Sequence, residues 1–158
     1  MGYIYELLQA PRPEEEWTTE YDFDESPSAF PIAERVGLAA NRDAVIAHFG
    51  AWLEERRLGL WMGEMFLVNR QAADHYFEGR FAAFQKAVSA LQELNEIQFI
   101  HDHDWVQALI DKLGQAFTQK YEDYVLWGDD MTPTPLEEFL RKAQPGQRYY
   151  FGAVMSYK

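Results

Sequence analysis

The chain has 158 residues, which suits one compact domain, and 47% of them are apolar, enough for a close-packed core. It contains no cysteine, which excludes disulfide bonds, thiolate metal sites and thiol nucleophiles. The 26 acidic and 14 basic side chains leave a net charge of −12, which disfavours direct binding to nucleic acid or to an anionic membrane surface. The first residues lack the pattern of a secretory signal, and no window approaches the ~20 apolar residues that span a bilayer. We therefore expect a single cytoplasmic domain over residues 1–158.

A strand, an irregular segment and a helix are predicted in the first third of the chain. Residues 2–9 are rich in aromatic and aliphatic side chains, which favours an opening strand that ends before Pro11. Residues 10–40 show no sustained period and contain four prolines; eight acidic residues stand against two basic ones between Pro11 and Arg35. They predict an irregular acidic arm. Residues 41–58 repeat apolar side chains at helical spacing after the capping residue Asn41, which predicts a helix.

The next stretch fits two predictions. Apolar side chains recur at helical spacing from Met62 to Leu91, which favours one long helix over residues 62–94. The run Met65-Phe66-Leu67-Val68 is apolar on both faces, so residues 60–68 also fit a strand, with the helix starting at the cap-like Asn69. Whether residues 60–68 are helical or extended is left open by the sequence.

Two helices and a closing strand are predicted in the second half. Residues 96–100 fit an apolar connection, and the helical spacing from Trp105 to Val125 predicts a helix over residues 103–126. Thr134-Pro135-Leu136-Glu137 fits a capping box before a short helix that ends at Ala143. Residues 148–157 are rich in Tyr, Phe and Val and predict a strand. The expected fold is α+β and mainly helical, with three to four helices and with N- and C-terminal strands that form a small antiparallel sheet.

The string His101-Asp102-His103-Asp104 contains candidate metal ligands. Its acidic residues suit the N-terminus of the helix that follows, so helix capping is the simpler interpretation. The alternative is a metal site made by His75, His101, Asp102 and either Asp123 or Asp130. That arrangement is similar to the one in HD-type metal-dependent hydrolases, which are also helical, and the similarity would imply a hydrolase.

The acidic residues gather in two stretches that also carry aromatic side chains. The first stretch is the arm, and the second covers residues 121–140, where no basic residue occurs. Aromatic anchors surrounded by carboxylates bind basic protein surfaces and speed association, as is typical of immunity proteins, antirestriction proteins and nucleic-acid mimics. The residues expected to bind such a partner are Trp17, Glu20, Tyr21, Asp22, Asp24, Glu122, Asp129 and Asp130.

No sequence motif for nucleophilic or nucleotide chemistry accompanies these residues, since the chain has neither a Gly-x-Ser-x-Gly elbow nor a glycine-rich phosphate loop. The sequence therefore favours a non-enzymatic interaction protein that needs no cofactor and binds a basic partner, for example as an inhibitor of a nucleic-acid-handling enzyme. A metal-dependent hydrolase is the first alternative. The second is a structural subunit of a homo-oligomer, with the Met and aromatic stripe from Met62 to Phe84 as its interface.

Overall fold

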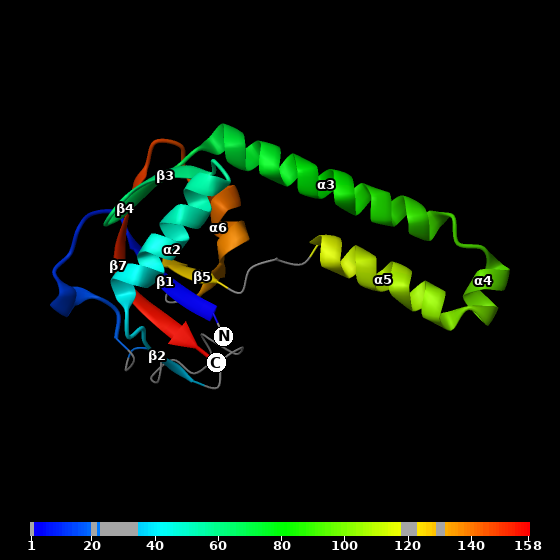
Figure 1. The fold of residues 1–158 in the computed structure, drawn as a ribbon, viewed down its shortest axis with the longest axis horizontal. Helices are drawn as coiled ribbons and strands as arrows, with labels where there is room; N and C mark the ends of the chain where they lie inside the picture. The colour runs from blue at the N-terminus through cyan, green and yellow to red at the C-terminus, as the bar shows by residue number, and fades with distance from the viewer. Residues whose placement is uncertain (1, 20–21, 23–34, 118–122, 129–131) are drawn as a thin grey trace. The chain divides into compact units, whose positions relative to one another are not determined.

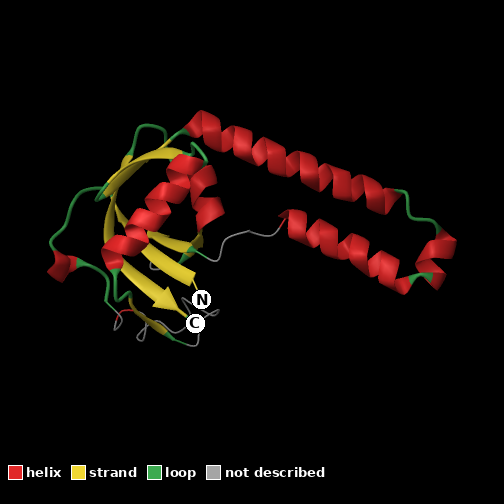
Figure 2. Ribbon diagram, in the orientation of Figure 1, coloured by secondary structure: helices red, strands yellow, loops and turns green. Residues whose placement is uncertain are grey.

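A computed structural model describes residues 2–19, 22, 35–117, 123–128 and 132–158, and the chain divides into two compact units (Figure 1). Unit 1 comprises Met1–Ala73 and Tyr121–Lys158, and unit 2 comprises Asp74–Lys120. The described strands all belong to unit 1, whereas the described elements of unit 2 are helices (Figure 2). None of the described helices combines the length and the apolar character that a bilayer span requires.

Unit 1 is built on a mixed sheet of seven strands. They are β1 (Gly2–Leu8), β2 (Val36–Leu38), β3 (Gly59–Met62), β4 (Met65–Val68), β5 (Tyr124–Trp127), β6 (Thr134–Pro135) and β7 (Arg148–Tyr157). The strand order is β3-β4-β7-β1-β5-β6, and β2 also pairs with β7. β1 runs antiparallel to β7 and parallel to β5. The two terminal strands are therefore neighbours in the middle of the sheet.

Helices α2 (Arg42–Glu55) and α6 (Leu136–Lys142) cover one face of this sheet. Phe66 of β4 is fully buried, and its ring lies 5.4 Å from that of Phe49 in α2 and 6.3 Å from that of Phe139 in α6. Ile46 and Leu53, which the helical spacing places on the same side of α2 as Phe49, are also buried. Aromatic rings thus fill the space between the sheet and its two helices.

The opposite face of the sheet carries a second, smaller core. It consists of Ile4, Leu126, Ala153 and Met155, and Trp17, Val36, Tyr124 and Tyr157 pack against it. β1, β5 and β7 are consequently covered on both faces, which is why their sequences are apolar runs instead of an alternation of polar and apolar residues.

A β-bulge in β7 decides which of its side chains face the helices. Tyr5 pairs with Val154 but Leu7 pairs with Phe151, so β7 has one residue more than β1 between these two pairs. The extra residue shifts the alternation of the strand. Phe151 therefore lies in the aromatic core, whereas Ala153 joins the cluster on the opposite face.

Unit 2 is a helical hairpin formed by α3 (Arg70–Gln92), which begins in unit 1, α4 (Glu96–His101) and α5 (His103–Phe117). Asn95 and Gln98 form a capping box at the start of α4. The Gln98 amide donates to the Asn95 side chain at 2.9 Å, and the Asn95 amide donates to the Gln98 side chain at 3.1 Å. Asp102 ends α4, and its Oδ1 accepts a hydrogen bond of 3.2 Å from the Trp105 amide in the first turn of α5. These two caps turn the chain so that α5 returns alongside α3 (Figure 1).

The prediction of a mainly helical fold with a small antiparallel sheet is wrong. The terminal strands do pair antiparallel, but they belong to a seven-stranded mixed sheet that includes the parallel pair β1–β5. The described residues also hold five α-helices instead of three to four. The error comes from the short strands: Tyr124 and Val125 continue the helical spacing of α5, although they lie in a strand.

Other element predictions are confirmed or corrected one by one. The helix over 41–58 is confirmed as α2, and the terminal strands are confirmed as β1 and β7. At residues 60–68 the extended alternative is right, because β3 and β4 form a hairpin there. The connection at 96–100 is α4, and the capping box at Thr134 is absent, since Pro135 precedes α6 without a side-chain bond. The single domain and the irregular arm over residues 10–40 stay predictions.

Candidate functional site

Two of the eight residues predicted to bind a partner are described. The Trp17 indole Nε1 donates to the Arg12 carbonyl at 3.0 Å, and the Arg42 guanidinium carbon lies 4.3 Å from the ring centroid of Trp17. Asp22 is exposed, and its Oδ2 accepts from the backbone and hydroxyl of Thr19 at 2.6 and 2.9 Å. Within unit 1, Trp17 thus holds its own segment against Arg42 of α2. The predicted residues Glu20, Tyr21, Asp24, Glu122, Asp129 and Asp130 lie outside the described residues.

Three of the predicted metal ligands lie in unit 2, where His75 is far from the other two. His75 is near the start of α3 and is 90% exposed, with its Nδ1 3.8 Å from an oxygen of Glu78. His101 and Asp102 lie beyond the other end of α3, which puts about 25 Å of helix between them and His75. Asp102 caps α5, so the capping interpretation of this string is confirmed.

The remaining described ligand candidate, Asp123, belongs to unit 1. Its Oδ1 accepts from the Tyr3 backbone N–H at 3.0 Å, where β5 and β1 lie side by side. Within the described part of the chain, no group of three or more His, Asp and Glu side chains is placed to hold a metal ion. Asp130 lies outside the described residues, and the hydrolase alternative stays a prediction.

A buried polar cluster forms where β7 bulges. Glu6 is 7% exposed, and its carboxylate accepts hydrogen bonds from the Ala153 amide at 2.9 Å and from the hydroxyl of Thr18 at 2.7 Å. Arg42 donates to the carbonyls of Gly152 and Phe151 at 2.8 and 3.1 Å. These two side chains thereby satisfy the backbone groups that the bulge takes out of the sheet ladder.

Arg42 also binds an exposed carboxylate at the edge of this cluster. Both of its terminal nitrogens bond the carboxylate of Glu64, at 3.2 and 2.8 Å, and this hydrogen-bonded pairing lowers the pKa of Glu64. The Trp17 ring covers the same guanidinium. Because every charged group of the cluster is hydrogen-bonded within the protein, its arrangement serves to join α2, the sheet and the segment of Trp17.

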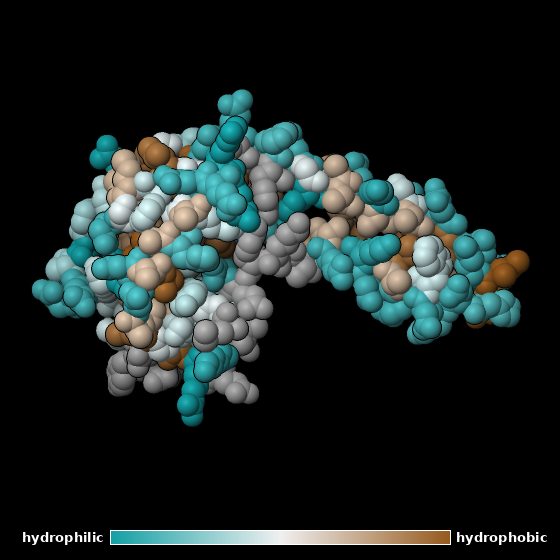
Figure 3. All heavy atoms as spheres, in the orientation of Figure 1, coloured by the Kyte–Doolittle hydropathy of each residue, from teal (hydrophilic) through white to brown (hydrophobic). Residues whose placement is uncertain are grey.

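The large apolar side chains that are exposed among the described residues are concentrated in unit 2. Seven of the ten large apolar side chains that are exposed among the described residues belong to this unit. They are Phe81, Ile97, Phe99, Ile100, Trp105, Ile110 and Phe117. In contrast, only Val106 and Leu109 are buried among the residues of unit 2 whose side chains the structure describes. The hairpin therefore keeps most of its apolar side chains accessible, and apolar atoms gather at its α4 end in Figure 3.

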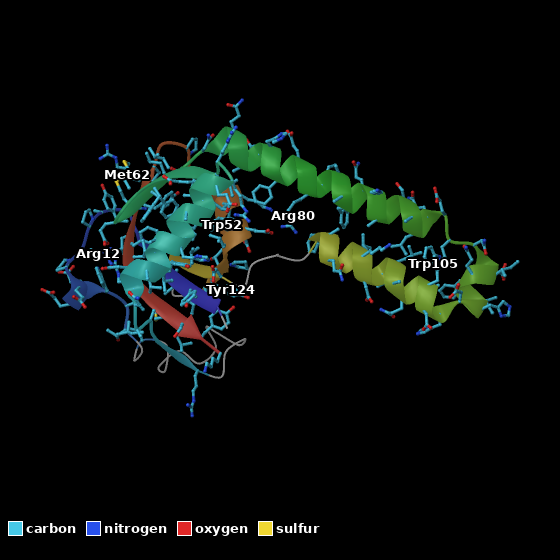
Figure 4. The ribbon with its side chains drawn as sticks, viewed as in Figure 1. Arg12, Trp52, Met62, Arg80, Trp105 and Tyr124 are labelled. Carbon is cyan, nitrogen blue, oxygen red and sulfur yellow. The ribbon has the colours of Figure 1, made fainter. Side chains whose placement is uncertain are left out.

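A groove of about 810 Å³ lies within unit 2, between α3 and α5. Small residues of α3, namely Gly79, Ala83, Ala87 and Ala90, form one side of it. Trp105, Leu109 and Ala116 of α5 lie on the other side, and Leu94, which follows α3, also lines the groove. Figure 4 shows Trp105 and Arg80 near opposite ends of α5, where Arg80 donates to the carbonyls of Ala116 and Phe117, each at 3.3 Å.

The charges of unit 2 are divided between the groove and the remaining surface. All three described basic residues of the unit, Arg80, Lys86 and Lys112, line the groove. Of the seven described acidic residues, only Glu93 does so. The groove is thus a cationic, apolar site in a chain whose net charge is −12.

No protein-family model, no curated protein and no solved structure matches this chain. The candidate site consequently stands on the geometry of the hairpin. Sequence reasoning missed it, although one signal was present: Gly79, Ala83, Ala87 and Ala90 recur at helical spacing beside the aromatic stripe of the same helix. Small residues at such spacing permit the close approach of another chain segment.

Proposed function

We propose that this chain is a protein-interaction module that binds its partner through the helical hairpin of unit 2. The observation that carries the proposal is the exposure of apolar side chains on this hairpin, above all Ile97, Phe99 and Ile100 of α4, which are 72%, 65% and 62% exposed. Monomeric proteins rarely keep large apolar patches in water unless the patch is an interaction site. The proposal places the protein in the cytoplasm, as its sequence leads us to expect.

Apolar anchors of this kind supply most of the affinity of an interface. Full burial of a large aliphatic or aromatic side chain contributes about 1.5–3 kcal/mol. The α4 residues lie on one short helix at a turn of the chain, so a concave partner surface can cover all three together. Fully covered anchors near the centre of an interface are the usual hot spots of binding.

The test is an affinity capture from the native host lysate with quantitative mass spectrometry. The bait is the full chain, compared with the triple variant Ile97→Gln, Phe99→Gln, Ile100→Gln. A matched control, Leu38→Gln, Leu60→Gln, Met62→Gln, removes the three large apolar side chains of unit 1 that are exposed among the described residues. Circular dichroism of all three proteins establishes that they fold alike.

We expect one partner to be captured by the full chain and by the unit 1 control, and to be recovered at least tenfold less with the α4 variant. Three hot-spot residues at about 1 kcal/mol each exceed that factor. Equal recovery by the α4 variant, or equal loss with the unit 1 control, would refute binding through the hairpin.

The net charge of −12 favours a second mode of interaction, with a basic partner bound by the acid-rich stretches. Such a partner could be a nucleic-acid-handling enzyme that the chain inhibits. Replacing Asp22, Asp24, Asp129 and Asp130 by Asn should then slow association with the captured partner and flatten its salt dependence. Unchanged association kinetics would eliminate this mode.

A further inference from the structure

We propose that the groove between α3 and α5 binds an acidic amphipathic helix of a partner protein. The inference rests on the proposed interaction function and specifies the segment of the partner that is recognised. It joins two independent properties of the groove, its shape and its charge.

The shape of the groove suits a helix. Its lining residues run along α3 and beyond from Gly79 to Leu94, a length of about 23 Å, or roughly four helical turns. Ala83, Ala87 and Ala90 leave room for the side chains of a third helix to pack between α3 and α5. Trp105 lies in the same groove with 46% of its surface exposed, and it offers a large apolar contact to the occupant.

The charge of the groove selects an acidic occupant. Lys86 and Lys112 stand on opposite helices of the lining, and in the described part of the chain neither forms an ion pair with another side chain. Acidic residues on the flanks of a docked helix would lie beside these ammonium groups. The more distant acids of the chain oppose such a partner only weakly, since exposed charges are screened beyond ~8 Å at physiological salt.

A second copy of this chain is a poorer occupant. In a twofold dimer each groove would face the other, so that Lys86 and Lys112 of one copy would meet the same lysines of its partner. Like charges placed against each other across an interface cost affinity. A basic helix is disfavoured for the same reason.

The experiment uses two fluorescein-labelled helical peptides of about 16 residues, the length of the groove lining. Both carry the same stripe of Leu and Ala; one has Glu on both flanks of the stripe, and the other has Lys. Fluorescence anisotropy with the full-length protein measures their affinities at low and moderate salt. We expect the Glu peptide to bind at least tenfold more tightly at low salt and to lose affinity as salt rises.

Matched variants locate the binding. Ala87→Trp fills the groove and should weaken the Glu peptide at least tenfold, whereas Ala82→Trp, on an exposed position of α3 outside the lining, should change it less than twofold. The double variant Lys86→Glu, Lys112→Glu should reverse the preference toward the Lys peptide. The control Lys142→Glu, Lys158→Glu makes the same change in net charge within unit 1 and should preserve it.

Four results would overturn the inference: no binding of the Glu peptide, equal binding of both peptides, full affinity after Ala87→Trp, or sedimentation as a dimer that Ala87→Trp dissociates. The last result would assign the groove to a second copy of the chain. The groove inference and the proposed function fail separately. If capture depends on α4 but the Glu peptide does not bind, only the groove inference is removed. If the peptide binds but capture does not depend on α4, what is removed is the assignment of the partner contact to the apolar residues of α4.

Discussion

The Tyr5 hydroxyl is buried without a hydrogen-bond partner among the described residues. Its side chain is fully buried in the aromatic core, with the rings of Phe49 and Phe151 at centroid distances of 4.8 and 6.3 Å. Burial, with smaller contributions from Asp123 and Tyr3, raises the pKa of this hydroxyl far above its ordinary value of 10.0. A buried hydroxyl that makes no hydrogen bond costs stability, because it has lost its bonds to water.

Tyr5→Phe should therefore raise the free energy of unfolding by about 1 kcal/mol, measured by urea denaturation at neutral pH. Tyr149→Phe is the matched control, since that residue is also buried but its hydroxyl accepts from the Gln144 amide at 3.2 Å and donates to Gln147 at 3.4 Å. It should lower the free energy of unfolding by about 1 kcal/mol. Destabilisation by both variants would contradict an unsatisfied Tyr5.

The pH dependence of the same variant gives an independent reading. Above pH 10.0 the unfolded chain loses the Tyr5 proton while the folded chain keeps it, so the stability contributed by the protonated hydroxyl declines as pH rises. One such proton corresponds to about 1.4 kcal/mol per pH unit. The free energy of unfolding of Tyr5→Phe should consequently fall less steeply above pH 10.0 than that of the parent protein. Parallel profiles would show that Tyr5 ionises normally in the fold.

At the scale of elements, the bulge of β7 depends on one carboxylate. The Glu6 carboxylate of β1 accepts a hydrogen bond from the Ala153 amide and further hydrogen bonds from the amide and hydroxyl of Thr18. It therefore joins the bulge to the segment that begins with Trp17. A side chain on Gly152 would collide with this carboxylate. The bulge, the glycine and the glutamate are thus parts of one arrangement.

Glu6→Ala should destabilise unit 1 by about 3 kcal/mol, because it leaves the buried Ala153 amide without an acceptor. Glu64→Ala is the control at the exposed side of the same cluster. Its side chain is 66% exposed, and loss of its ion pair with Arg42 should cost less than about 1 kcal/mol. Urea denaturation measures both, and the indole N–H resonance of Trp17 should shift more with Glu6→Ala. Similar losses from the two variants would mean that the bulge does not rely on Glu6.

The sequence predicts best those elements whose signals are local. The terminal strands are runs of aromatic and aliphatic residues, the first ending before Pro11 and the second beginning after Pro145. α2 repeats its apolar residues over four turns. β5 was missed because Tyr124 and Val125 continue the spacing of α5, and its strand conformation depends on pairing with β1 about 120 residues away. The groove was missed for a related reason. Helical spacing shows that Trp105 shares a face with Leu109, but not how closely the neighbouring helix packs against that face.

At the scale of the whole molecule, the buried side chains are divided unequally between the two units. Unit 1 contains the aromatic core and the second, smaller core on the opposite face of the sheet. In the described part of unit 2, Val106 and Leu109 are the buried residues. Stability within a structure follows such differences, since segments with few buried apolar contacts open more readily. The sequence predicts one domain over residues 1–158. If the hairpin opens at a lower free energy than the sheet, the two units do not behave as one cooperative domain.

Hydrogen exchange distinguishes one cooperative domain from two units that open separately. We expect amides of α5 to exchange through openings of much lower free energy than amides of β1 and β7, whose exchange should require global unfolding. Leu109→Ala, which removes a buried side chain at a cost of about 2–5 kcal/mol, should accelerate exchange in α5 and leave that of β7 unchanged. Val125→Ala in β5, where the side chain is fully buried, should instead accelerate exchange in β1 and β7. If Leu109→Ala accelerated amide exchange in β7 as much as in α5, the two units would unfold together. The hairpin would then not open independently of the sheet.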